Sequence, residues 1–180
     1  MQLVKFMAAT KDDALTLSMG EMAALHSWVD ASFAVHPDCE SHGGLVLIMK
    51  GGKGAILSGS EKQKLNTDSG TVAELVGMHQ FSWRIMSALM FLECQGHKAQ
   101  ENVLCQDNKS AILLEKNGCA SASKRTRAVN AQHFQMKDYT DKKQLEVKCC
   151  RTNDMIGDHV TKGSQGCKFS EFGKAIMGME

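Results

Sequence analysis

The order of hydrophobic patterns along the chain is the feature that most constrains its fold. Residues 25–33 are rich in strand-forming residues, and residues 44–50 form a continuous apolar run. A glycine-rich turn at 51–54 then leads into a third candidate strand that begins over 55–58. From residue 72 to 92 the period changes, because apolar residues recur at helical spacing for about six turns. The pattern therefore predicts an antiparallel three-stranded meander followed by one long helix.

The remaining segments continue as alternating strands and helices. The expected elements are a strand over 101–106, a helix over 107–116, an irregular helix over 124–139, a strand over 145–150, and helices over 153–161 and 169–177. Weaker patterns suggest a short helix over 1–7 and an edge strand over 14–18. A meander followed by βα units predicts an α/β fold with a five-stranded mixed sheet, in which parallel strands extend the meander and helices flank it.

Composition excludes several classes of protein. The chain has 180 residues, of which 43% are hydrophobic and 23% charged, which is typical of a single soluble globular domain. A net charge of +1 disfavours a pure nucleic-acid-binding protein, and no apolar run approaches the roughly 20 residues of a membrane span. The seven cysteines include no C-x-x-C pair, so we expect neither a zinc site nor a disulfide framework. Reduced, scattered cysteines indicate an intracellular location, cytoplasmic or nuclear. Both tryptophans, Trp28 and Trp83, are interpreted as core residues.

Four acidic residues stand at the edges of apolar or structured segments: Asp30, Glu74, Asp107 and Asp158. Each has a purely structural alternative. Asp30 fits the polar face of an edge strand, and Glu74 fits a capping box that starts at Thr71. Asp107 fits a helix N-cap, and Asp158 fits a solvent-facing position on a short helix.

The expected topology nevertheless predicts that these acids come together. The first strand should lie centrally with the fourth strand beside it, which makes Asp30 and Asp107 neighbours, and the start of the long helix can direct Glu74 to the same place. Hydrolysis of a phosphodiester by two metal ions requires several hard oxygen ligands around cations that lie roughly 3.5–4 Å apart. The sequence therefore predicts a two-metal site.

The strings around these acids resemble a known family. They read W-V-D-A-S-F-A-V-H-P-D, K-Q-K-L-N-T-D-S-G-T-V-A-E-L-V-G, Q-D-N-K-S-A-I-L-L-E-K-N-G and S-K-R-T-R. Over about residues 28–177 the chain resembles the ribonuclease H domain of copia-type retrotransposon polyproteins.

The resemblance implies an RNase H-like fold, two Mg²⁺ or Mn²⁺ ions, and cleavage of the RNA strand of an RNA–DNA hybrid. By motif match, Asp30, Glu74 and Asp107 are implied as the core metal ligands. Asp158, in I-G-D-H-V-T-K-G, matches the acid of the family's L-A-D-x-x-T-K-P string and is implied as the fourth ligand. The expected partners are the hybrid and the reverse transcriptase region of the same polyprotein, with no membrane and no small-molecule cofactor.

The chain also departs from the family pattern. The family's S-S-T-E-A-E string reads S-G-T-V-A-E here, and its T-K-P and C-P-T strings have lost their prolines. These changes motivate an alternative, a decayed retroelement fragment that at most binds nucleic acid duplexes. A third hypothesis is an integrase or transposase of the same fold, which the Q-D-N-K-S-A string and the early position of Glu74 disfavour.

Other residues are candidates for contacts with the substrate. Lys124, Arg125 and Arg127 form a basic cluster that is either a phosphate-binding patch or an ordinary solvated face. Asn108 and Gln106 flank the third acid and either contact ribose hydroxyls or serve as a helix cap and an exposed strand end. His159 is a candidate auxiliary residue for proton transfer or product release.

The expected domain organisation has three parts. Residues 1–24 are interpreted as the tail of a preceding reverse transcriptase or connection region, residues 25–162 as the RNase H-like domain, and residues 163–180 as a C-terminal helical tail.

Overall fold

A five-stranded mixed sheet forms the centre of the molecule. The computed structural model describes residues 2–21, 24–98, 100–117, 135–163 and 166–179. The strands are β1 (Ala24–Ser32), β2 (His42–Met49), β3 (Leu57–Lys62), β4 (Glu101–Gln106) and β5 (Glu146–Cys149). Their order across the sheet is β3-β2-β1-β4-β5. The pairs β1–β2 and β2–β3 are antiparallel, whereas β1–β4 and β4–β5 are parallel, which confirms the predicted meander with parallel strands beside it.

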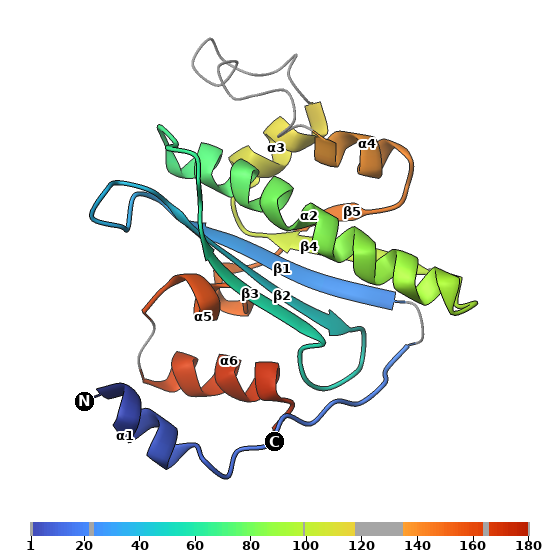
Figure 1. The fold of residues 1–180 in the computed structure, drawn as a ribbon. Coiled ribbons are helices and arrows are strands. Elements are labelled where there is room, and N and C mark those ends of the chain that lie inside the picture. Colours follow the sequence, from blue (N-terminus) through green and yellow to red (C-terminus); the bar gives the residue numbers. More distant parts are fainter. Residues whose placement is uncertain (1, 22–23, 99, 118–134, 164–165, 180) are drawn as a thin grey trace.

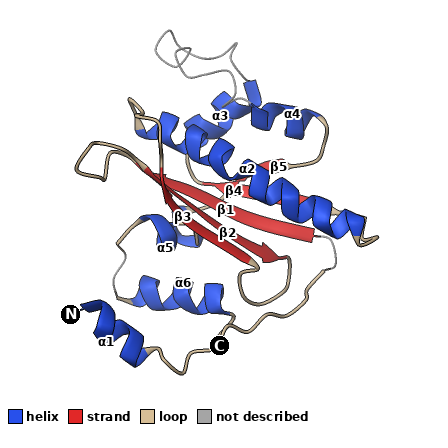
Figure 2. Ribbon diagram, viewed as in Figure 1, coloured by secondary structure: helices blue, strands red, loops and turns tan. Residues whose placement is uncertain are grey.

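Helices cover both faces of this sheet. The helical elements of the described residues are α1 (Gln2–Ala9), α2 (Gly70–Cys94), α3 (Lys109–Asn117), α4 (Gln135–Asp141), the 3₁₀ turn η4 (Thr152–Asp154), α5 (Asp158–Thr161) and α6 (Cys167–Met177). Figure 1 shows α2, α3 and α4 on one face, and α5 and α6 on the other. The same layers are visible by element type in Figure 2, where α1 lies beside α6. No described helix is both long and apolar enough to cross a membrane.

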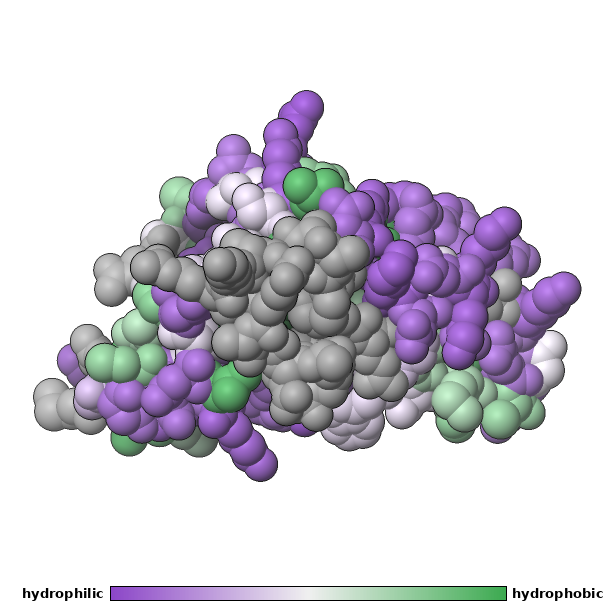
Figure 3. Space-filling view, turned by 90° about the horizontal axis from the view of Figure 1, so that it is seen from above, coloured by the Kyte–Doolittle hydropathy of each residue, from purple (hydrophilic) through white to green (hydrophobic). Residues whose placement is uncertain are grey.

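Two apolar layers hold the helices to the sheet. On the α2 side the core includes Val29, Leu75, Phe81 and Leu104, all fully buried. On the other side Val46, Ile48 and Ala55 are buried, with partly buried residues of α5 and α6 packed against them. A continuous apolar run such as β2 is expected for a strand that is covered on both faces. Seen from the side of α3 and α4, the coloured surface is mainly hydrophilic, with hydrophobic residues in small patches (Figure 3).

The long helix begins with a side-chain cap. The hydroxyl of Ser69 accepts a hydrogen bond from the backbone N–H of Val72, so Ser69 is the N-cap. Glu74 lies further into α2 than the third helical position, and the capping-box alternative for Glu74 is therefore wrong. The sequence predicts Trp83 in the core, but Trp83 is 60% exposed on the outer side of α2, where its ring lies beside the guanidinium of Arg84.

Most other predicted elements are present, with two differences. The helix expected over 153–161 is instead the 3₁₀ turn η4, an irregular segment, and the single turn α5. The edge strand expected over 14–18 is only an isolated bridge between Ser18 and Lys53. Of the irregular helix expected over 124–139, the described part is α4, and the rest lies outside the described residues.

Candidate metal centre

Three acidic side chains from three separate elements converge at one end of the sheet. Asp30 lies near the end of β1, Glu74 lies in the second turn of α2, and Asp107 directly follows β4. One carboxylate oxygen of each lies within 4.8 Å of the others. A cluster of this size fits a divalent cation, which takes carboxylate oxygens as ligands.

The parallel pairing of β1 with β4 explains why two of these acids are neighbours. Trp28 is paired with Cys105, and Asp30 and Asp107 each lie two residues further along the chain, Asp30 within β1 and Asp107 directly after β4. Because side chains alternate with a period of two, both acids continue the same face of the sheet at the same level. Asp30 is nearly fully buried on the central strand, so the edge-strand alternative for it is wrong.

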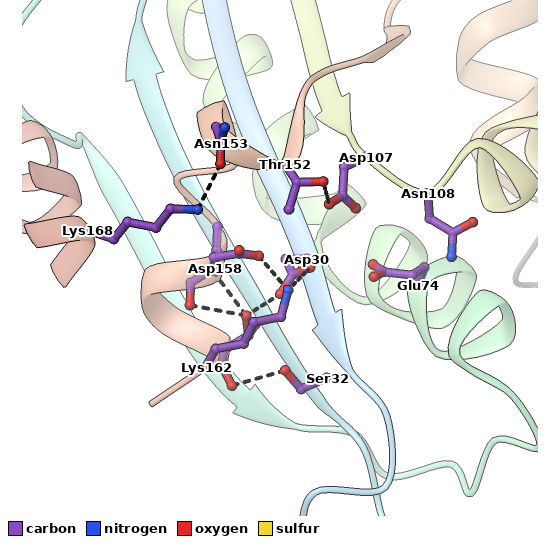
Figure 4. Close-up of polar contacts among 12 residues, drawn as sticks. Asp30, Ser32, Glu74, Asp107, Asn108, Thr152, Asn153, Asp158, Lys162 and Lys168 are labelled. Atoms are coloured by element: carbon purple, nitrogen blue, oxygen red, sulfur yellow. Dashed lines mark hydrogen bonds and ion pairs between the residues drawn. The ribbon is translucent and has the colours of Figure 1, made fainter. Parts of the chain in front are cut away.

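Asp30 is contacted by two polar side chains from the α5 side. The hydroxyl of Thr161 donates to Oδ2 of Asp30, and the Lys162 Nζ lies 3.3 Å from Oδ1. Burial raises the pKa of Asp30, and these two contacts oppose that rise. Figure 4 shows Lys162 reaching between Asp30 and Asp158.

Glu74 carries the larger conflict between burial and charge. Its residue is 6% exposed, and its Oε2 accepts a hydrogen bond of 3.0 Å from Nε2 of Gln106. Burial, and then repulsion by Asp30, raise the pKa of Glu74 to about 8. A carboxyl group in this position is stabilised as an anion once a cation lies beside it.

Gln106 positions two of the three acids. It is fully buried, and its Oε1 accepts the backbone N–H groups of Asp107 at 2.8 Å and Asn108 at 3.1 Å. Its Nε2 donates to Glu74 and to the backbone carbonyl of Val29. The exposed strand end and the ribose contact that we expected for Gln106 do not fit this position, because both ends of its amide are engaged inside the protein.

Asp107 lies at the mouth of the cluster and is not a helix cap. Its Oδ2 accepts a hydrogen bond of 3.0 Å from the hydroxyl of Thr152 in η4. Instead, Oδ1 of Asn108 caps α3, because it accepts the backbone N–H groups of Ser110 and Ala111. The capping alternative is therefore confirmed for Asn108 and wrong for Asp107.

Asp158 is adjacent to the three acids but is not among them. It is 9% exposed, so the solvent-facing alternative is wrong. Its Oδ1 lies 2.6 Å from Nζ of Lys162, and that ammonium group links it to Asp30. Asp158, the fourth expected ligand, is thus linked to the three acids by the ammonium group of Lys162, which also contacts Asp30.

His159, the candidate auxiliary residue, is not one of the three converging acids. The ring of His159 packs against the ring of Phe169 in α6, with 4.8 Å between centroids, and burial lowers its pKa. Lys124, Arg125 and Arg127 lie outside the described residues.

Sequence reasoning missed three residues that contact the acids: Thr152, Thr161 and Lys162. The spacing of four between Asp158 and Lys162 is a pattern that could have indicated their ion pair, since residues four apart face each other on a helix. The contacts of Thr161 and Lys162 with Asp30 join positions 131 and 132 residues apart, and no local pattern predicts them.

The donor set fits the divalent cations that the family resemblance implies. Asp30, Glu74 and Asp107 supply only hard oxygen ligands, which suit Mg²⁺ or Mn²⁺ better than softer metals. Burial raises the pKa values of Asp30 and Glu74, so a cation beside them would stabilise both carboxylates as anions. The residues present therefore fit a cation at this position.

Comparisons with known proteins agree with the fold. No family model matches the chain. Over 178 residues, 98% of this chain, it is 29% identical to the retrovirus-related Pol polyprotein from transposon TNT 1-94 of Nicotiana tabacum. The chain spans only 13% of the length of that curated relative.

Solved structures share the same architecture at low identity. An RNase H1 isolated from compost superposes with a TM-score of 0.54 and 13% identity, over 77% of this chain and 93% of that one. The N-terminal RNase H domain of a Mycobacterium tuberculosis protein also gives a TM-score of 0.54, with 11% identity over 83% and 98% of the two chains. The chain therefore has the fold of RNase H domains and is similar, over nearly its whole length, to part of a retrotransposon Pol polyprotein.

Proposed function

We propose that this chain is a ribonuclease H that hydrolyses the RNA strand of RNA–DNA hybrids with two divalent cations, Mg²⁺ or Mn²⁺. The observation that carries the proposal is the convergence of Asp30, Glu74 and Asp107 within an RNase H fold. Cations held there would supply an activated water molecule and stabilise the leaving oxygen of the phosphodiester. The protein then needs no serine or cysteine nucleophile.

The protein's own residues have distinct roles in this proposal. Asp30, Glu74 and Asp107 are metal ligands, and Asp158 is a ligand on the far side of Asp30. Gln106 is a positioning residue, because it fixes the carboxylate of Glu74 and the backbone that carries Asp107. Thr152 orients Asp107 by donating a hydrogen bond to its Oδ2.

The substrate is proposed to lie across this end of the sheet. The basic cluster of Lys124, Arg125 and Arg127 would contact phosphates, and the side-chain NH₂ group of Asn108 would contact a ribose hydroxyl. Such contacts recognise the shape of the duplex and the 2′-hydroxyl, and they read no base sequence. We keep His159 as an auxiliary residue only because it directly follows Asp158 in the sequence.

The chain's biological setting follows the resemblance. We propose that residues 1–24 continue a preceding reverse transcriptase region, that residues 25–162 form the nuclease, and that residues 163–180 are a C-terminal helical extension. The reverse transcriptase region would be the protein partner, and the cytoplasm or nucleus the place of action.

Cleavage of a labelled RNA–DNA hybrid tests the proposal. We expect the wild type to cut the RNA strand only when Mg²⁺ or Mn²⁺ is present, and Asp107→Asn to lower the rate by about a hundredfold or more, because one ligand charge is lost. Asp154→Asn is the matched control, since Asp154 is an exposed acid close to the site, and it should cleave at the wild-type rate.

Each contrary outcome identifies a different error. If the wild type binds the hybrid but does not cut it with either metal, the decayed-fragment alternative replaces the enzyme. If Asp107→Asn cuts as fast as the wild type, the assignment of the metal ligands is wrong. Double-stranded DNA and single-stranded RNA of the same sequence define the substrate class in parallel reactions.

A further inference from the structure

Lys162 brings a positive charge into the middle of the acidic residues. Its Nζ lies 2.6 Å from Oδ1 of Asp158 and 3.3 Å from Oδ1 of Asp30. Both acids are buried, whereas the Lys162 side chain is 44% exposed. The ammonium group therefore lies between these two carboxylates (Figure 4).

The two halves of the acidic site are held by different chemistry. On one side, the hydrogen-bond partners of Glu74 and Asp107 are the amide of Gln106 and the hydroxyl of Thr152, which are neutral. On the other side, Asp30 and Asp158 share a full positive charge. A divalent cation beside Glu74 and Asp107 would add charge that this half lacks, whereas one between Asp30 and Asp158 would meet a cation already in place.

We propose that Lys162 is a tethered cation that makes the two metal positions unequal and sets the order in which they fill. The first ion binds beside Glu74 and Asp107. The second binds between Asp30 and Asp158 only when the ammonium group of Lys162 withdraws. This inference rests on the proposed function for the location of the metal site, and it adds a positioning residue that controls how readily the second ion binds.

Lys162 and a second metal ion would exclude each other because of both charge and space. Lys162 contacts one oxygen of each of the two carboxylates that would hold the second ion, so the ammonium group and the ion would compete for the same pair of acids. Two cations at one pair of carboxylates also repel each other in a partly buried site. Because lysine is long and flexible and this side chain borders solvent, it can move away without unfolding α5.

Titration with Mn²⁺ in the absence of nucleic acid tests the inference. Calorimetry of the wild type should resolve a tight and a weak binding event whose dissociation constants differ by at least about tenfold. A tenfold difference corresponds to about 1.4 kcal/mol of binding free energy. Lys162→Met should tighten the weak event by about tenfold and leave the tight event within about twofold. Lys162→Arg keeps the charge and should behave as the wild type.

Lys168→Met is the matched control, because Lys168 also lies near the site but bonds to Asn153 and not to the acids. It should leave both binding events unchanged. Asp158→Asn should remove the weak event from the wild type and from Lys162→Met alike. Unequal events that Lys162→Met leaves unchanged, or two equal events in the wild type, would overturn the inference.

Thermal melting separates this role from a general effect on folding. In EDTA, Lys162→Met should melt below the wild type, because two buried carboxylates lose their counter-charge, and saturating Mn²⁺ should close the gap. A gap that Mn²⁺ leaves unchanged would show that Lys162 is only structural. The hybrid-cleavage assay is separate, so failure of the proposed nuclease activity and failure of this inference give different results.

Discussion

Glu74 is the residue at which burial and charge conflict most strongly. Desolvation and the neighbouring Asp30 raise its pKa from 4.5 to about 8, and the hydrogen bond from Gln106 opposes this only in part. A buried acid of this kind is costly as an anion, and such costs are concentrated where a protein binds a charged ligand. Considered in the sequence alone, the same residue is better explained as a helix-capping glutamate.

The first prediction concerns the pH dependence of stability without metal. A carboxyl group whose pKa is higher in the folded than in the unfolded state binds more protons when folded, so stability falls as pH rises. For Glu74 this loss extends from about pH 4.5 to about pH 8, and the raised pKa of Asp30 acts in the same direction. In EDTA, Glu74→Gln should therefore flatten the decline in the free energy of unfolding across this window.

Urea denaturation at several pH values provides the measurement. Glu93→Gln is the control, because Glu93 lies exposed near the end of the same helix and should leave the pH profile of the wild type intact. Parallel profiles for the wild type and Glu74→Gln would contradict the prediction.

At the scale of elements, the single turn α5 is short but supplies side chains that contact the acidic site. It carries Asp158 and Thr161, and Lys162 follows it directly. It lies close to the sheet because two glycines leave room for it: Gly44, which is paired with Asp30 across β1 and β2, and Gly157, which lies against Asp30. A Cβ at Gly44 would lie 2.5 Å from the side chains of both Val160 and Thr161.

The second prediction follows from this close packing. Gly44→Ala should force α5 away from β2, weaken the contacts of Thr161 and Lys162 with Asp30, and destabilise the fold by about 1–3 kcal/mol. Calorimetric Mn²⁺ binding should weaken in the same variant. Gly163→Ala is the control, since a Cβ there meets no atom within 4 Å, and an equal effect of both substitutions would contradict the steric argument.

At the scale of the whole molecule, the C-terminal helix completes the second apolar layer. Phe172 is buried in α6, and Ile176 packs against the layer formed by Val46, Ile48 and Ala55. The backbone carbonyl of Ile176 also accepts the N–H group of Ala55 at 2.8 Å. The segment proposed as a tail is thus packed on the sheet that carries the acids.

The third prediction is that this segment is needed for stability. A chain that ends at residue 162 should lose about 2 kcal/mol or more of unfolding free energy, because burying one large apolar side chain stabilises by about 1.5–3 kcal/mol. Removal of residues 1–13 is the comparison: Leu3, Val4 and Met7 in α1 are exposed, so this change should cost far less. Urea midpoints that fall equally for the two shortened chains would contradict the assignment.

Much of the fold could be predicted because it depends on local patterns. The alternation of strands, the change to helical period at α2, and the central place of β1 beside β4 follow from residue order and from rules of sheet topology. The single turn α5 was overestimated as a longer helix, because a short segment held by tertiary contacts carries little periodicity. Trp83 was misplaced because a broad apolar helix does not reveal which part of its surface stays uncovered.

The sequence by itself determined the order of elements, the mixed sheet, and the candidate acids Asp30, Glu74 and Asp107, because hydrophobic period and the position of an acid relative to a strand end or helix start are local properties. Only the tertiary structure decided that Gln106 is buried beneath these acids and that Lys162 joins Asp30 to Asp158. The physical reason is that charge compensation depends on which groups lie within a few ångströms in space. Residues more than 100 positions apart meet there only after both faces of the sheet are packed.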